Sequence, residues 1–285
     1  MLFTFILLCS QLWAGDAPKG VSLKWEPIRL VNGSPVLLKL ASVRLLKSVS
    51  GNLLDHDVFF SFDARSNTWV GLAGISLETR PGSYPLKIKC ETKNGETVSL
   101  ERSLTVHAGK YLKIKATVPK QFIEPTPEQQ HEISEDQALK KQVFAHVSDE
   151  REWSGRFLAP VSARISDVFG TTRIFNGKEE GVHQGLDYAV PQGTPVAALN
   201  RGTVLLAKPL FFEGTCVIVD HGQGLLSLYM HLSELKVKEG DPVTKGQIVG
   251  LSGGTGRATG PHLHVAVRWE GIYLNPATLL SLQLP

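Results

Sequence analysis

Short runs in which apolar and polar residues alternate, each followed by turn-forming residues, recur between residues 21 and 118. They constrain the fold more than any other feature of the sequence. In Leu86-Lys87-Ile88-Lys89 every second side chain is apolar, which is the period of a strand with one buried and one wet face. Breaks such as Asn32-Gly33-Ser34 and Pro81-Gly82-Ser83 recur at the intervals of a sandwich. The pattern predicts an all-β chain in which residues 21–118 form an immunoglobulin-like β-sandwich.

A connector is expected over residues 119–156. Three prolines give it an extended entry, and Ser134-Glu135-Asp136-Gln137 has the residue types of a capping box. A helix is therefore predicted near residues 135–147. Its apolar stripe, at steps of four residues, is expected to pack on a neighbouring domain and consists of Leu139, Val143 and Val147.

The remaining region, residues 157–285, holds four histidines and one aspartate in three glycine-flanked segments: His183, Asp187, His231, His262 and His264. On a strand, side chains two or four positions apart share a face, so each of the two close pairs projects from one side. Imidazole and carboxylate are zinc ligands, and a catalytic zinc site uses three protein ligands. The residues predict a metal site, but they leave open which histidines are ligands, and any one histidine could instead be a hydrogen-bonded structural residue.

Three motifs carry a family resemblance: His183-x-x-x-Asp187, Tyr229-x-His231-Leu232-Ser233 and Gly260-Pro261-His262-Leu263-His264. Together they resemble the lysostaphin-type (LytM-like) peptidoglycan zinc endopeptidases, over roughly residues 157 to 280. The resemblance implies a C-terminal duplicated hybrid-motif β domain over residues 157–285.

The same resemblance assigns roles to the site residues. It implies one Zn²⁺ on His183, Asp187 and His264, with His231 and His262 as catalytic histidines that are not ligands. It places Arg173 and Asn176 in a loop at the cleft rim, as candidate substrate-binding or occluding residues.

The sequence departs from the family pattern at two places. Val265-Ala266 stands where an aromatic and an acidic residue are often found, and Glu213-Gly214-Thr215-Cys216 stands where members tend to have a Gly-Asn turn. Neither change touches a ligand, so the substrate preference is the property left open.

The chemistry implied is hydrolysis of peptide bonds in peptidoglycan stem peptides or cross-links by zinc-activated water. The motif segments contain no glutamate to act as base, so imidazole, with an ordinary pKa of about 6.5, is the expected replacement. One of His231 and His262 is expected to take the water's proton while the other stabilises the developing charge. The alternative is a non-catalytic LytM-like regulator, or a wall-binding module, that activates another hydrolase.

Export to the periplasm or cell envelope is expected from the N-terminus. An apolar run over residues 2–9 is too short to span a bilayer and is followed by Ala14-Gly15, which resembles a secretory signal peptide over residues 1–14. A net charge of +3 favours an anionic polymer such as cell wall. Peptidoglycan is the partner that the family resemblance implies, with no nucleic acid and no membrane span expected in the mature chain. The layout also suggests that the 173–176 loop or the N-terminal half covers the cleft until displaced.

Overall fold

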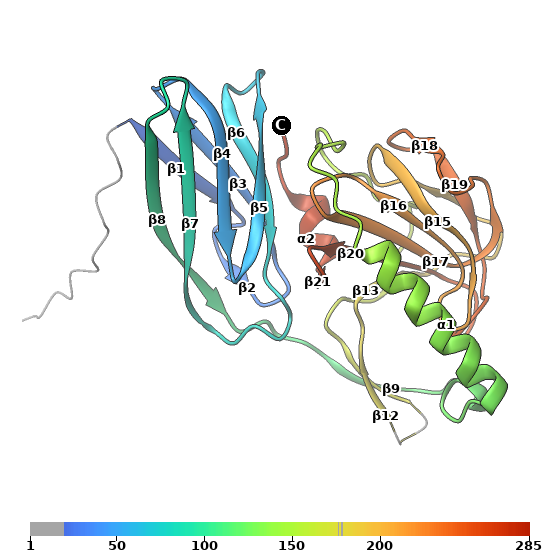
Figure 1. Ribbon diagram of the computed structural model, residues 1–285. Helices are drawn as coiled ribbons and strands as arrows, with labels where there is room; N and C mark the ends of the chain where they lie inside the picture. The colour runs from blue at the N-terminus through green and yellow to red at the C-terminus, as the bar shows by residue number, and fades with distance from the viewer. Residues whose placement is uncertain (1–19, 176, 178) are drawn as a thin grey trace, which may run out of the picture.

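The computed structural model describes residues 20–175, 177 and 179–285. The predicted signal peptide and Asn176 lie outside these residues. The described chain is built almost entirely of strands, so the all-β prediction is confirmed, and it forms two β-rich halves side by side (Figure 1).

The N-terminal half is a two-layered sandwich in which all strand pairs are antiparallel except that of β2 with β8. One layer contains β1 (Val21–Glu26), β3 (Pro35–Ser42), β6 (Thr68–Gly74) and β5 (His56–Asp63). The other contains β4 (Leu46–Leu53), β7 (Gly82–Thr92), β8 (Thr97–His107) and the short β2 (Leu30–Val31). Strand β5 pairs with β4 through its first half and with β6 through its second half, so it joins the layers. This order is that of an immunoglobulin-like sandwich.

Alternation in β7 produces the buried face as the sequence predicts. Leu86, Ile88 and Cys90 are buried, whereas Lys87 and Lys89 are exposed. Burial raises the pKa of the Cys90 thiol, and it raises that of Cys216 in the other half to about 12. Both cysteines are free, and at neutral pH both thiols stay protonated.

The connector contains β9 (Lys113–Ala116), a 3₁₀ turn η1 (Lys120–Phe122) and helix α1 (Pro127–Phe144). The helix begins eight residues before the position expected from Ser134. Thr126 is its N-cap, because its hydroxyl accepts from the Gln129 backbone N–H while the Gln129 side chain accepts from the Thr126 N–H. Pro127 at the first helical position suits this start. The helix also ends before Val147, which is exposed.

Strand β9 does not belong to the sandwich. It pairs in parallel with β11 (Thr172–Phe175), and β11 forms a hairpin with β12 (Glu179–Val182). The last strand of the region predicted as sandwich is therefore part of the C-terminal half.

The C-terminal half is organised around one large antiparallel sheet. Its strands run in the order β10 (Ile165–Asp167), β13 (Gly185–Tyr188), β20 (Leu263–Trp269), β17 (Leu225–Leu235), β16 (Gly214–Asp220), β15 (Gly202–Leu210) and β18 (Pro242–Val243). Around this path lie β14 (Pro195–Ala197), β19 (Ile248–Ser252), β21 (Ile272–Leu274) and the short helix α2 (Pro276–Ser281). The central strands β16, β17 and β20 are buried almost throughout and form the core of this half.

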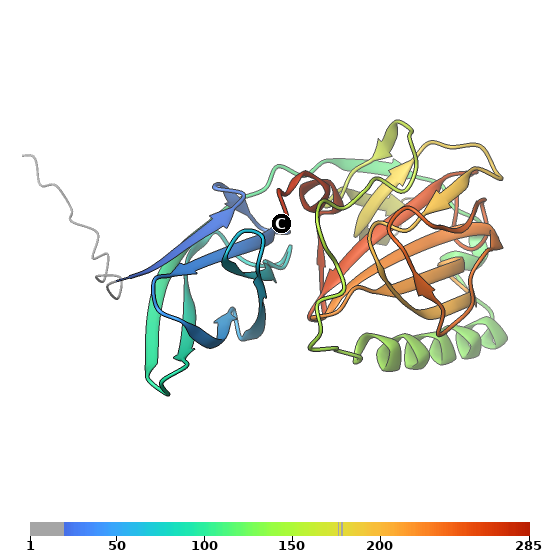
Figure 2. The same cartoon turned by 90° about the horizontal axis from the view of Figure 1, so that it is seen from above.

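Helix α1 lies across one face of this sheet (Figures 1 and 2). Its partly buried side chains, Leu139, Val143 and Phe144, pack against an apolar cluster that includes Ala266 of β20. The Arg268 guanidinium lies 4.0 Å from the centre of the Phe144 ring. Because alternate residues of a strand share a face, the face that α1 covers is also the face to which His264 points.

The two halves contact each other through β20, β21 and α2. Gly74 of the sandwich packs so closely on this region that a Cβ added there would lie 2.7 Å from Leu274 Cδ2. The Asn275 N–H donates to the Gly33 carbonyl, and the rings of His56 and Trp269 lie 5.5 Å apart. Neither helix among the described residues has the length and apolar character needed to cross a bilayer.

Candidate metal centre

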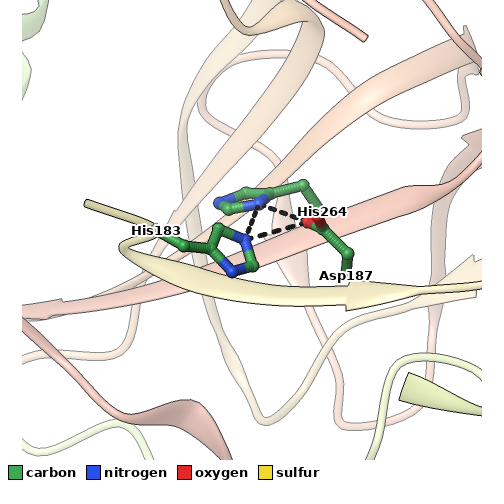
Figure 3. A group of neighbouring side chains, drawn as sticks. All are labelled: His183, Asp187 and His264. Carbon is green, nitrogen blue, oxygen red and sulfur yellow. Dashed lines mark hydrogen bonds and ion pairs between the residues drawn. The ribbon is translucent and has the colours of Figure 1, made fainter. Parts of the chain in front are cut away.

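Two neighbouring strands bring an aspartate and a histidine together. In the antiparallel pair β13 and β20, Asp187 is directly opposite His264. Side chains opposite each other in such a pair have Cβ atoms about 4.5–5.5 Å apart. His183 lies four residues before Asp187, between β12 and β13, and its ring turns toward the same point (Figure 3).

Three potential ligand atoms form a small triangle. Nε2 of His183 lies 3.0 Å from Oδ1 of Asp187 and 3.0 Å from Nδ1 of His264, and the latter two atoms are 2.8 Å apart. The three side chains are the group whose ligand atoms could hold one ion, and all three residues are at least nine-tenths buried.

The protonation of His183 makes this triangle suited to a cation. Its Nδ1 donates to the Val168 carbonyl at 2.9 Å, since a carbonyl can only accept. In a neutral ring, Nε2 then carries a lone pair, which faces the Asp187 carboxylate oxygen. Two acceptors this close repel each other unless a cation lies between them. Tetrahedral zinc with bonds of 2.0–2.2 Å separates its ligand atoms by about 3.3–3.6 Å, so the three atoms would move apart only slightly.

Gly185 makes room for the His264 ring. A Cβ at this position would lie 2.6 Å from both Cε1 and Nε2 of His264 and 2.4 Å from the Val265 carbonyl oxygen. Any larger side chain at position 185 would therefore push the His264 imidazole away from Asp187.

The other two histidines of the motifs lie beside the triangle. The ring centres of His231 and His262 are 4.7 Å apart, and His231 is 6.1 Å from His264. The Nδ1 of His231 donates to the Thr255 carbonyl and that of His262 donates to the Gly260 carbonyl, both at 2.8 Å. In their neutral forms both rings thus keep a lone pair on Nε2. Nε2 of His262 lies 3.8 Å from Oδ1 of Asp187.

His231 adopts a left-handed backbone conformation, with φ of +60°. This conformation costs a residue other than glycine about 1–3 kcal/mol and persists where the surroundings enforce it. Here the His231 N–H donates to the Glu213 carbonyl at 2.9 Å, and the ring is tied to Thr255 on another loop. The strained backbone therefore directs one specific side chain toward the triangle.

Burial and neighbouring charges set the protonation states of the site. Burial lowers the pKa of His231 to about 3 and also lowers that of His264, so both rings are neutral at pH 7. Burial by itself raises the pKa of the Asp187 carboxyl. The hydrogen bonds and charges of the His183 and His264 imidazoles together outweigh burial, so this pKa lies below its ordinary value. The site thus offers neutral imidazoles and an ionised carboxylate, which are the forms that bind metals.

A cavity of about 510 Å³ opens over the triangle. One wall is apolar and includes Ile114 of β9 together with Phe175 and Phe212. The Arg257 guanidinium lies 5.2 Å from the ring centre of Phe175 and 4.7 Å from that of Phe212. The cavity is large enough for part of a peptide and combines apolar, cationic and metal-binding surfaces.

Six of the seven proposed site residues line this cavity, and five of them belong to the three motifs: His183, Asp187, His231, His262 and His264. Arg173 is the sixth, and it makes three hydrogen bonds to aspartates. Asn176 lies outside the described residues. Sequence reasoning missed Asp167 and Glu213 as members of the site, since neither belongs to a motif with a metal-ligand spacing.

Comparisons with known proteins match the part of the chain that contains this site. A model of peptidase family M23 matches residues 181–276, and a point mutant of the catalytic domain of the M23 protein EnpA from Enterococcus faecalis is 32% identical. That match covers 95% of the EnpA domain and 42% of this chain, with a TM-score of 0.37. The chain belongs to peptidase family M23.

Two further relatives of this M23 chain differ in how much they share with it. Peptidoglycan DD-endopeptidase ShyA of Vibrio cholerae is 38% identical over 123 residues, which are 43% of this chain and 28% of ShyA. A crystal structure of a protein from Pseudomonas aeruginosa assigned to peptidase M23 is 28% identical and has a TM-score of 0.67. That likeness covers 88% of this chain and 95% of the other, so it extends over both halves of the fold.

Proposed function

We propose that this chain is an exported zinc metalloendopeptidase that hydrolyses peptide bonds in the stem peptides or cross-links of peptidoglycan. The observation that carries the proposal is the convergence of three ligand atoms within 4.8 Å of one another, beneath a cavity that two further histidines line. The substrate class is supported by ShyA, a relative named as a peptidoglycan DD-endopeptidase.

In this proposal His183, Asp187 and His264 hold the metal. When bound, zinc supplies Lewis acidity, which lowers the pKa of water from about 15.7 toward 7 and polarises a carbonyl group. The buried carboxylate of Asp187 contributes the one full negative charge of the ligand set, while the Val168 carbonyl fixes the His183 ring in the tautomer with a free Nε2.

The other two histidines have separate tasks. Nε2 of His262 lies at the edge of the ligand triangle and accepts a proton from the attacking water, then returns it to the leaving amine. His231 is more deeply buried and remains neutral, so it orients the reacting groups through its Nε2 lone pair. The Gly260 carbonyl orients the His262 ring, because it accepts from Nδ1–H.

The decisive experiment combines metal analysis with muropeptide release from purified sacculi. We expect one zinc per chain, release of muropeptides by the purified protein, loss of release after chelation and recovery on adding zinc. Zinc binding without any release would instead support the regulator or wall-binding alternative. A purified, folded chain that takes up no zinc would refute the metal site and the hydrolase together.

A further inference from the structure

Arg173 of β11 is directed at two aspartates beside the metal centre. Its Nε and Nη2 donate to Oδ2 of Asp167, at 2.8 and 2.6 Å, and its Nη2 also donates to Oδ2 of Asp187. All three side chains are largely buried, with exposed fractions of 21% for Arg173, 13% for Asp167 and 10% for Asp187. Three of the five guanidinium N–H groups are thereby committed to carboxylates.

The contacts divide the two oxygens of Asp187 between different partners. Oδ1 faces the rings of His183 and His264 at 3.0 and 2.8 Å, whereas Oδ2 faces Arg173. A carboxylate can bind a metal through one oxygen or through both. Oδ2, which accepts from the Arg173 guanidinium, is turned away from the ligand triangle, and its negative charge is compensated by Arg173.

We propose that Arg173 is a positioning residue of the metal centre, which holds Asp187 so that Oδ1 alone serves as ligand. The inference rests on the proposed zinc function and extends it to a residue outside the ligand set. Partners that orient a ligating group commonly contribute 10–100-fold to metal affinity. The role differs from the substrate contact suggested by the sequence, because three of the five N–H groups are bonded to carboxylates of the protein.

Asp167 makes this arrangement compatible with a divalent cation. An unpaired guanidinium so close to zinc would repel it, but Asp167 compensates the charge of Arg173 through two hydrogen bonds. Asp167 is itself fixed, since its Oδ1 accepts from the Val168 N–H at 2.8 Å and the strand register places it opposite Asp187. Val168 also orients His183 through its carbonyl. One short segment therefore orients two ligands, His183 directly and Asp187 through Arg173.

The geometry requires arginine rather than a generic cation. The planar fork lets two nitrogens grip Asp167 while a second hydrogen on Nη2 reaches Asp187. Lysine carries the same charge on a single nitrogen and cannot reproduce both contacts in one plane. Replacement by lysine should therefore recover the charge and only part of the positioning.

The test measures zinc affinity in the full chain by competition with a chromophoric chelator. We expect Arg173→Met to weaken zinc binding about 10–100-fold and Arg173→Lys to fall between Met and wild type. Arg257→Met is the matched control, because Arg257 lines the same cavity but contacts Phe175 and Phe212. This control should leave the zinc dissociation constant unchanged.

Cobalt substitution gives a second measurement that a purely structural role would not alter. In the Met variant Oδ2 of Asp187 is released and can join Oδ1 on the metal, which raises the coordination number. We therefore expect the visible absorption of the cobalt form to weaken relative to the four-coordinate wild type. Asp167→Asn offers a further variant that keeps the Arg173 side chain, and it should also weaken zinc binding because the guanidinium loses its compensating charge.

The outcomes separate the two proposals. A wild-type protein that binds zinc, with an Arg173→Met variant that binds it equally tightly and gives the same cobalt spectrum, would overturn the positioning role alone. A folded wild-type protein without zinc affinity would overturn both. If Arg173→Met does not fold, as shown by thermal melting, the zinc affinities of the Arg173→Lys and Asp167→Asn variants decide, and wild-type affinity in both would refute the inference.

Discussion

At the scale of single residues, His231 and His262 are chemically alike but differ in their surroundings. Both donate from Nδ1 to a backbone carbonyl, so both keep Nε2 for chemistry. His231 is buried and its backbone is left-handed, whereas the His262 side chain keeps 16% of its surface exposed and lies closer to Asp187. The more accessible ring is suited to exchanging protons, and the buried one is suited to fixed orientation.

This difference leads to a prediction for alanine variants. His262→Ala should lower kcat for muropeptide release by about 10²–10⁴, the usual contribution of acid–base catalysis, while one zinc per chain is retained. His231→Ala should also lower kcat with zinc bound. His107→Ala, which alters an exposed histidine of the sandwich, is the control and should release muropeptides at the wild-type rate. Full turnover in the zinc-bound His231 or His262 variant would contradict the assigned role of that residue.

Sequence patterns could predict part of this site because the strand period is fixed by geometry. His262 and His264 lie two positions apart, and this spacing alone places them on one face whatever the rest of the fold. Asp167 could not be found this way. Its place beside Asp187 depends on an irregular pairing of β10 with β13, twenty residues away, and no local pattern encodes that register.

At the scale of elements, α1 is the segment whose position was hardest to predict. The sequence predicted a capping box at Ser134, whereas the structure forms one with Thr126 and Gln129. Ser134 instead donates to the Gln130 carbonyl inside the helix. The helix has no fully buried side chain, so its hold on the sheet depends on a few contacts. Two polar contacts join it to the C-terminal half: Lys140 Nζ donates to Glu213 Oε1 at 2.5 Å, and the Phe211 N–H donates to Asp136 Oδ2 at 2.6 Å.

We predict that Lys140→Met loosens α1 and disturbs Glu213. The substitution leaves Glu213 without a compensating charge in a place where its side chain is only 15% exposed, which is destabilising. Because the Glu213 backbone carbonyl accepts from the His231 N–H, movement of Glu213 should also disturb His231 and lower the rate of muropeptide release. Faster amide hydrogen exchange over residues 127–144 would report the loosening directly.

Lys141→Met provides the matched control for this prediction. Lys141 is the next residue of the same helix, and it is exposed. The Lys141→Met variant should show wild-type amide hydrogen exchange over residues 127–144 and wild-type muropeptide release. Unchanged exchange and unchanged activity in Lys140→Met would refute the idea that this ion pair keeps α1 over the sheet.

At the scale of the whole molecule, a buried network joins the connector to the C-terminal sheet around His221. Its Nδ1 donates to the Arg201 carbonyl at 2.7 Å, and its Nε2 lies 2.8 Å from the Ser227 hydroxyl. The backbone N–H groups of Glu152 and Trp153, at the end of the connector, donate to the His221 carbonyl. Burial lowers the pKa of this imidazole to about 4, so the native fold holds it neutral.

This network makes the stability of the fold sensitive to acid. The unfolded chain takes up a proton on His221 below a pKa of about 6.5, whereas the native chain excludes it until about pH 4. Unfolding is therefore coupled to proton uptake in this window, and stability falls as the pH falls through it. The contribution amounts to at most about 3 kcal/mol.

Chemical denaturation of the wild type and of His221→Gln at several pH values would measure this effect. The variant should be less stable at pH 7, yet it should lose less stability between pH 6.5 and 4. The same pH slope in both proteins would show that other groups cause the acid sensitivity.

The pairing of β9 with β11 determines where the chain can be joined to another protein to make a chimera. Turn signals suggested a domain boundary after residue 118, but residues 113–116 complete the sheet that leads to His183. A chimera grafted at residue 118 would import a foreign partner strand beside the first ligand. A graft point near residue 108 would keep β9 with the peptidase and leave that edge covered.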